Sequence, residues 1–83
     1  MPTVAVIDGV KIQFFPDEHP PPHFHAKFAE FTAQIGIDPV VILKGALPAN
    51  KRQDVLDWAN ARRSLLREAW TTMASGRKPE KIP

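Results

Sequence analysis

The stretch that decides the fold reads His-Phe-His-Ala-Lys-Phe over residues 23–28 and Phe-Thr-Ala-Gln-Ile-Gly-Ile over residues 31–37. In both runs the residues alternate so that every second position is apolar, which is the pattern of a strand with one buried face. Ala29 and Glu30 separate the two runs. The alternation therefore predicts two strands, each with one face suited to the core.

Two further strands are predicted nearer the start of the chain. Residues 3–7 are mostly β-branched and apolar, and residues 10–15 alternate. Asp8 and Gly9 lie between them, and such a dipeptide suits a two-residue hairpin turn because glycine tolerates a positive φ. Residues 40–43 are predicted to form a fifth strand or an extended approach to a helix.

A single long helix is predicted in the second half of the chain. Pro48 suits a helix start, where its missing N–H costs nothing, and Gly76 suits a helix end. Between them the apolar residues recur at helical spacing. The predicted apolar stripe consists of Val55, Ala59, Leu66, Ala69, Trp70 and Met73.

One residue breaks this helical pattern. Arg62 falls inside the apolar stripe, between Ala59 and Leu66. We expect its aliphatic part to lie along the core and its guanidinium to pair with a carboxylate such as Asp8 or Glu30.

Together these elements predict one α+β domain over residues 1–83. A small, mostly antiparallel sheet of four or five strands is expected within about residues 3–44. One long C-terminal helix, at about residues 49–75, is expected to cover one face, and residues 76–83 to form an extended tail. The other, more open face would carry the histidines, and such a one-sided domain leaves surface for a partner or for a homo-oligomer.

Composition excludes several classes of protein. The chain has no cysteine, so it has no disulfide and no thiolate metal site. Its longest strongly apolar run, residues 39–43, is far too short to span a membrane, and no basic segment precedes the first apolar run as in a signal peptide. We therefore expect a cytoplasmic protein with no membrane partner.

Charge is distributed unevenly along the chain. Residues 1–48 carry three lysines and five acidic residues, a net charge of −2, whereas residues 49–83 carry eight basic and four acidic residues, a net charge of +4. The basic helix and tail are expected either to contact RNA, DNA or an acidic protein, or to be a solvated surface.

All three histidines lie within seven residues, as His19, His23 and His25, and three consecutive prolines separate the first from the second. Residues i and i+2 of a strand share a face, so His23 and His25 should project together. Three imidazoles could hold Zn²⁺ or another divalent transition metal with one position left open, and Asp17 or Glu18 could add a carboxylate.

Two other interpretations of the histidines remain open. His23, His25 and Lys27 line one predicted strand face, with Thr32 and Gln34 as possible neighbours, which would suit a metal-independent ribonuclease. Alternatively, the imidazoles are structural and hydrogen-bond a rigid loop.

Four features of the chain form a recognisable combination. They are Met-Pro-Thr at the start, the run from His19 to His25, Gly45-x-Leu47-Pro48 before a helix that carries Trp58, and Lys-Ile-Pro over residues 81–83. Over essentially its whole length the chain resembles the bacterial family known as domain of unknown function 4160.

This resemblance implies no established activity and no catalytic residues. Members of that family are often encoded beside a second small domain of unknown function, in pairs that resemble toxin–antitoxin modules. The resemblance therefore implies a second small protein as partner, and a role in growth control or RNA cleavage.

Overall fold

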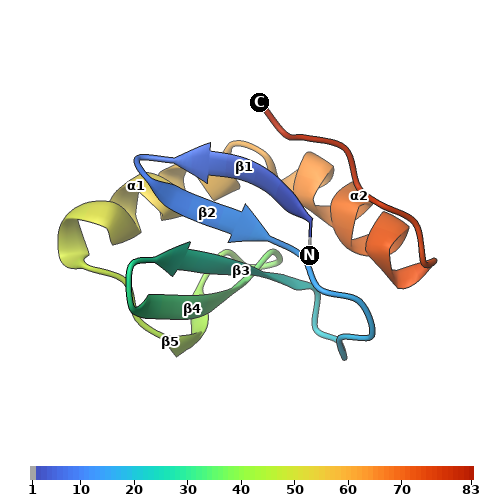
Figure 1. Ribbon diagram of the computed structural model, residues 1–83, viewed down its shortest axis with the longest axis horizontal. Helices are drawn as coiled ribbons and strands as arrows, with labels where there is room; N and C mark the ends of the chain where they lie inside the picture. The colour runs from blue at the N-terminus through green and yellow to red at the C-terminus, as the bar shows by residue number, and fades with distance from the viewer. Residues whose placement is uncertain (1) are drawn as a thin grey trace.

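Within residues 2–83, which the computed structural model describes, five strands form one antiparallel sheet in chain order (Figure 1). The predicted α+β class and the antiparallel sheet are confirmed. The strands are β1 (Thr3–Ile7), β2 (Val10–Gln13), β3 (His23–Phe28), β4 (Phe31–Gly36) and β5 (Ile42–Gly45).

Sequence alternation assigns the residues of the three middle strands to the two faces of the sheet. Phe24 of β3 lies opposite Ile35 of β4, and both are fully buried. His25 is one position further along β3, lies opposite Gln13 on one side and Gln34 on the other, and therefore projects from the opposite face. The sheet thus has one apolar face that forms the core and one polar face.

Two helices, not one, follow the sheet in the described residues. They are α1 (Ala49–Asn60) and α2 (Arg63–Ala74), and the prediction of a single long helix was wrong. A continuous helix over residues 49–74 would be about 39 Å long at 1.5 Å per residue, whereas the longest extent of the whole molecule is 34 Å. The chain breaks at Arg62, whose φ and ψ are −132° and 27°, and α2 turns back onto the sheet.

The second helix lies at the end of the sheet where β3 begins (Figure 1). Leu66 and Ala69 of α2 are buried in the core, together with Val55 and Ala59 of α1. The predicted apolar stripe is therefore correct although the helix is divided. Trp70 is only partly buried, because it faces the segment that joins β2 to β3.

The fifth strand lies later in the chain than expected, and the structure answers one question that the sequence left open. The fifth strand was predicted over residues 40–43 but lies at Ile42–Gly45, since the β4–β5 ladder has an irregularity between Gln34 and Ile35. Whether any X-Pro bond is cis was left open by the sequence, and both Pro20–Pro21 and Asp38–Pro39 are cis.

The tail after α2 is extended, as predicted, and lies along the first strand. The Ile82 amide donates a 2.8 Å hydrogen bond to the Val4 carbonyl of β1, and the Ile82 side chain is buried. Neither helix in the described residues is long and apolar enough to cross a membrane.

Candidate functional site

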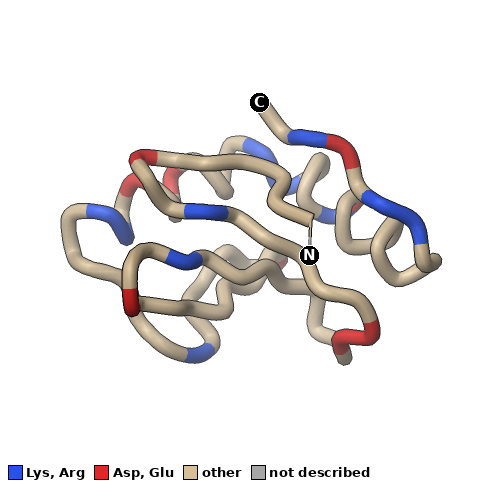
Figure 2. Tube along the Cα trace, in the orientation of Figure 1, with Lys and Arg blue, Asp and Glu red and all other residues tan. Residues whose placement is uncertain are grey.

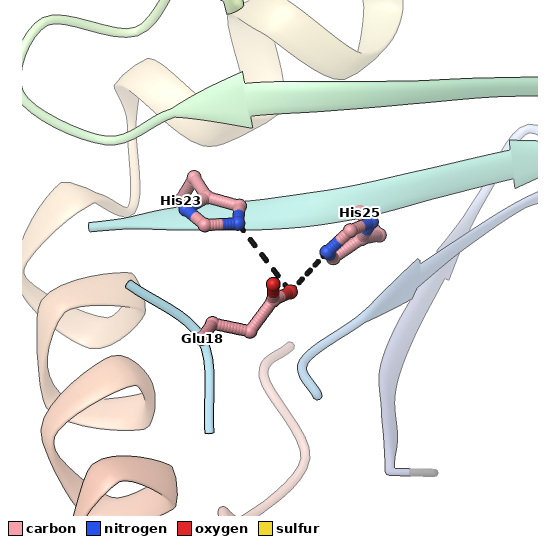
Figure 3. A group of neighbouring side chains, drawn as sticks. All are labelled: Glu18, His23 and His25. Atoms are coloured by element: carbon pink, nitrogen blue, oxygen red, sulfur yellow. Dashed lines mark hydrogen bonds and ion pairs between the residues drawn. The ribbon is translucent and has the colours of Figure 1, made fainter. Parts of the chain in front are cut away.

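The β2–β3 connection and the start of β3 bring together one carboxylate and two imidazoles (Figure 3). Glu18 comes from the connection, and His23 and His25 come from β3. One potential ligand atom from each of these three residues lies within 4.8 Å of the others. We call this group the Glu18–His23–His25 cluster.

His23 is held in one orientation by its surroundings. Only 6% of its surface is exposed, and its ring packs against the Trp70 ring of α2 at a centroid distance of 5.1 Å. Its Nδ1 lies 2.8 Å from the carbonyl oxygen of Pro21. Because a carbonyl only accepts hydrogen bonds, Nδ1 carries the proton, and Nε2 of the neutral ring is left with a free lone pair.

That lone pair faces another acceptor. His23 Nε2 lies 3.4 Å from Glu18 Oε1, is buried, and has no hydrogen-bond partner among the described residues. A carboxylate and an unprotonated ring nitrogen repel unless a positive species lies between them. The geometry therefore calls for a proton or a metal ion at this point.

His25 approaches the same oxygen from the other side. Its Nε2 donates a hydrogen bond to Glu18 Oε1, and its ring stands edge-on to Phe15 at a centroid distance of 4.4 Å. The His23 and His25 rings are 5.3 Å apart. The prediction that these two histidines project together from one strand face is thus confirmed.

The sheet face that carries the histidines was expected to be open, and this expectation is wrong at His23. Trp70 and the β2–β3 connection cover His23, because the break between the helices lets α2 reach this end of the sheet. His25 keeps 22% of its side chain exposed and borders a shallow hollow on the polar face, beside Gln34 and Lys44. The cluster is therefore buried on one side and reachable on the other.

The other predicted site residues lie apart from the cluster. His19 is exposed and does not belong to the group of ligand atoms, so Glu18 takes the place that the three-histidine prediction gave to His19. The prolines that follow His19 carry the chain past the cluster before β3 begins. Lys27 lies on the same face as His25, two residues further along β3, and is exposed.

Sequence reasoning named Glu18 only as an additional carboxylate and missed Trp70 and Phe15 as walls of the site. Trp70 was assigned to the core by its helical spacing. No local signal could have paired it with His23, because the contact depends on where α2 turns.

Arg62 is not part of the cluster, and its predicted pairing with Asp8 or Glu30 is wrong. Its guanidinium donates hydrogen bonds to the carbonyl oxygens of Trp58 and Pro83. It also lies 5.3 Å from the Trp58 ring centroid. Main-chain oxygens at the end of α1 and in the tail therefore accept its donors, in place of the side-chain carboxylates of Asp8 or Glu30.

Comparison with known proteins gives one family and no characterised relative. No curated protein and no solved structure matched the chain. The model of a family described as a domain of unknown function (DUF4160) matches residues 9–71, which include the whole Glu18–His23–His25 cluster and Trp70. Since this match covers well over half of the chain, the protein belongs to the DUF4160 family.

Proposed function

We propose that the protein binds a divalent transition metal ion, with Zn²⁺ as the first candidate, through Glu18, His23 and His25. The observation that carries the proposal is that both Nε2 atoms are directed at one carboxylate oxygen while His23 Nδ1 is already bonded to a carbonyl. Metal-bound histidines commonly donate their second ring N–H to a carbonyl in this way, which fixes the tautomer that binds.

The dimensions of the cluster support this proposal. Two ligands of a tetrahedral zinc ion, each about 2.0–2.1 Å from the metal, lie about 3.3 Å apart, and His23 Nε2 is 3.4 Å from Glu18 Oε1. An ion would replace the proton between His25 and Glu18, so these two side chains must rotate apart slightly. Two imidazoles and one carboxylate also leave a coordination position for water or a ligand.

The proposal is tested by adding zinc to protein that carries no histidine tag. We expect about one equivalent to bind in isothermal titration calorimetry. At a free zinc concentration 100 times the dissociation constant, binding should raise the free energy of unfolding by about 2.7 kcal/mol. Glu18→Gln, which keeps the shape of the side chain, and His25→Ala should each weaken binding by at least about tenfold.

His19→Gln is the matched control, because His19 is an exposed histidine of the same segment. It should bind zinc as the wild type does. Binding of less than about a tenth of an equivalent by the wild type, or equal losses in His19→Gln and Glu18→Gln, would contradict the proposed site.

A metal-independent ribonuclease is the second candidate. The hydrogen bond between His25 and Glu18 supports it, because a carboxylate that orients an imidazole is a common arrangement in acid–base catalysis. In this proposal His23 and His25 transfer protons and Lys27 stabilises the charged phosphate. RNA cleavage that persists in excess chelator and is lost in His25→Ala would favour it over the metal site.

We also propose that the protein is the protein-binding component of a toxin–antitoxin-like pair in the cytoplasm, with a second small protein encoded nearby as its partner. The support is the β5 edge of the sheet, where Val41 and Leu43 are 42% and 45% exposed. An exposed edge strand can extend into the sheet of another chain.

Co-expression with the neighbouring gene product tests this role. Leu43→Lys should abolish a stable complex on size-exclusion chromatography, whereas Val6→Lys, on the opposite edge strand, should not. A complex that survives Leu43→Lys, or a homo-oligomer that forms through β5 instead, would contradict the proposed partner role.

A further inference from the structure

The polar face of the sheet gathers all the positive charge of the first half of the chain. Lys11, Lys27 and Lys44 are the only basic residues in residues 1–48. Lys11 lies opposite Lys27 in the β2–β3 ladder, and Lys44 lies opposite Gln34 in the β4–β5 ladder. The register places all three on the face that carries His25.

One acidic residue of the same half, Glu18, reaches this face beside His25, but no acidic residue lies within the strands themselves. Asp8 and Glu30 occupy turns between strands, and Asp17, Glu18 and Asp38 lie in the connections. Figure 2 shows basic positions within β2 and β3 and at β5, while the acidic positions gather where the chain turns. The sheet face is therefore positive although residues 1–48 have a net charge of −2.

The pairing of Lys11 with Lys27 is unfavourable for folding. Like charges directly opposite each other on neighbouring strands repel. In residues 2–83 no carboxylate lies within 4.0 Å of Lys11, Lys27 or Lys44. Lys51, Arg63 and Arg67 do have acidic partners, whereas the exposed Arg52, Arg77, Lys78 and Lys81 of the helices and tail have none either within the described residues. An arrangement that costs stability and has no internal counter-charge is suited to an external anion.

Neutral hydrogen-bonding side chains separate these lysines. Gln13, His25, Gln34 and Lys44 lie opposite one another in one row across four strands. Thr32 lies opposite Lys27 in the next row. Thr32, Gln34 and Lys44 line the hollow that reaches His25. Amides and hydroxyls beside ammonium groups can bond phosphate oxygens and base edges alike.

We propose that this face, defined by Lys11, Lys27, Lys44, Gln13, Thr32 and Gln34, binds single-stranded nucleic acid through its phosphates. The lysines span three of the five strands, so they can contact successive phosphates of one extended strand. A duplex fits less well, because reading its grooves uses a projecting helix or ribbon, whereas the residues of this face lie on the strands of the sheet. The inference goes beyond metal binding and does not depend on it.

The test is fluorescence anisotropy with labelled 12-nucleotide oligouridylate and oligothymidylate in low salt. Each phosphate contact on a single strand contributes about −0.7 to the slope of log K against log salt concentration. The triple variant Lys11→Gln, Lys27→Gln, Lys44→Gln should therefore bind the oligonucleotides at least about tenfold more weakly. Its slope should also be less steep than that of the wild type by about 2. The two probes distinguish RNA from DNA.

The control is the triple variant Arg52→Gln, Arg63→Gln, Lys78→Gln. It has the same net charge as the first variant, since both lower the formal charge of +2 by three to −1. All three of its positions are exposed on the helices and tail. It should change affinity by less than about twofold, and the corresponding Lys→Arg triple variant should bind as the wild type does.

Three outcomes would overturn the proposal. Equal losses of affinity in the two glutamine variants would assign binding to overall charge or to the basic helix and tail. The other two are no binding of either oligonucleotide in low salt, and equally strong binding of oligoglutamate, which would indicate an acidic protein as the partner. Glu18→Gln should keep oligonucleotide affinity while losing zinc, so failure of the metal site and failure of this face are distinguishable.

Discussion

Two polar residues, His23 and Arg62, mark positions where distant segments meet, although only Arg62 breaks the sequence pattern. His23 is a polar residue buried under Trp70, and Arg62 is a basic residue within an apolar stripe. In each case the contact joins distant segments: the Trp70 ring of α2 packs on His23, and the main-chain oxygen of Pro83 accepts a hydrogen bond from Arg62. A polar residue at an apolar position can thus indicate a tertiary contact even when its partner cannot be named.

At the residue scale we expect Arg62→Met to destabilise the protein by about 1–2 kcal/mol, because hydrogen bonds from a charged donor to Trp58 and Pro83 are lost. Urea unfolding measures this change. Arg63→Met is the control, since Arg63 is half exposed and its ion pair with Asp38 is long, at 3.8 Å. It should cost less than about 0.5 kcal/mol. Equal costs would show that the contacts of Arg62 contribute nothing specific.

At the element scale, the sheet depends on one close approach of backbone between β4 and β5. Gly45 has a φ of 77°, and a Cβ there would collide with the carbonyl oxygen of Thr32 on β4. This explains why a glycine ends the fifth strand. The apolar run of residues 40–43 placed that strand two residues too early, because its composition says nothing about the irregularity of the ladder.

We expect Gly45→Ala to destabilise the protein by about 2–4 kcal/mol, through both the left-handed backbone and the clash with Thr32. Gly76→Ala separates these causes. Gly76 has a φ of 84° but nothing within 4 Å of its Cβ position, so it should cost only about 1 kcal/mol. Thermal unfolding compares the stability of the two variants. Equal losses of stability would exclude the clash with Thr32 as a cause of the effect of Gly45→Ala.

Lys51 of the first helix contacts the turn of the first hairpin at Asp8, which makes this contact sensitive to pH. Lys51 donates a hydrogen bond to the Asp8 carbonyl and pairs with the Asp8 carboxylate at 3.2 Å. The hydrogen bond from Lys51 lowers the pKa of Asp8, and the hydrogen bond with Asp8 raises the pKa of Asp54.

These two shifts act on stability with opposite signs. The contribution of Asp8 is present above the pKa of an unfolded aspartate and is lost as the pH falls through its lowered pKa. The contribution of Asp54 is present below that unfolded pKa and is lost as the pH rises through its raised pKa. We expect Lys51→Gln to raise the pKa of Asp8 in an NMR titration of the carboxyl carbons. The exposed neighbour Arg52 is the control, and a shift of similar size in Arg52→Gln would contradict this assignment.

At the scale of the whole molecule, the tail completes the core and protects an edge of the sheet. Ile82 is buried, its amide bonds to Val4 of β1, and Lys81 donates a hydrogen bond to the Thr3 carbonyl. The β1 edge is therefore partly covered by the tail. Under the proposed partner role, we expect another chain to pair with β5, the other edge strand of the sheet.

We expect Ile82→Ala to cost about 2–4 kcal/mol, as for other buried isoleucines, and to speed hydrogen exchange along β1. Glu80→Ala, an exposed change in the same segment, should cost less than about 0.5 kcal/mol. Stability measured in urea and amide exchange measured by NMR test this. An Ile82→Ala protein as stable as Glu80→Ala would mean that the tail does not contribute to the core.

The sequence by itself determined which residues face the core and which face solvent, because strand alternation and helical spacing depend only on local geometry. That was enough to predict the α+β class, the first hairpin, the extended tail and the shared face of His23 and His25. The tertiary structure decided the break at Arg62, since a straight helix of 26 residues would be longer than the whole molecule. That break brings Trp70 onto His23, and the β2–β3 connection brings Glu18, not His19, to the two imidazoles. These contacts join segments far apart in the chain, and no local pattern encodes the distance between them.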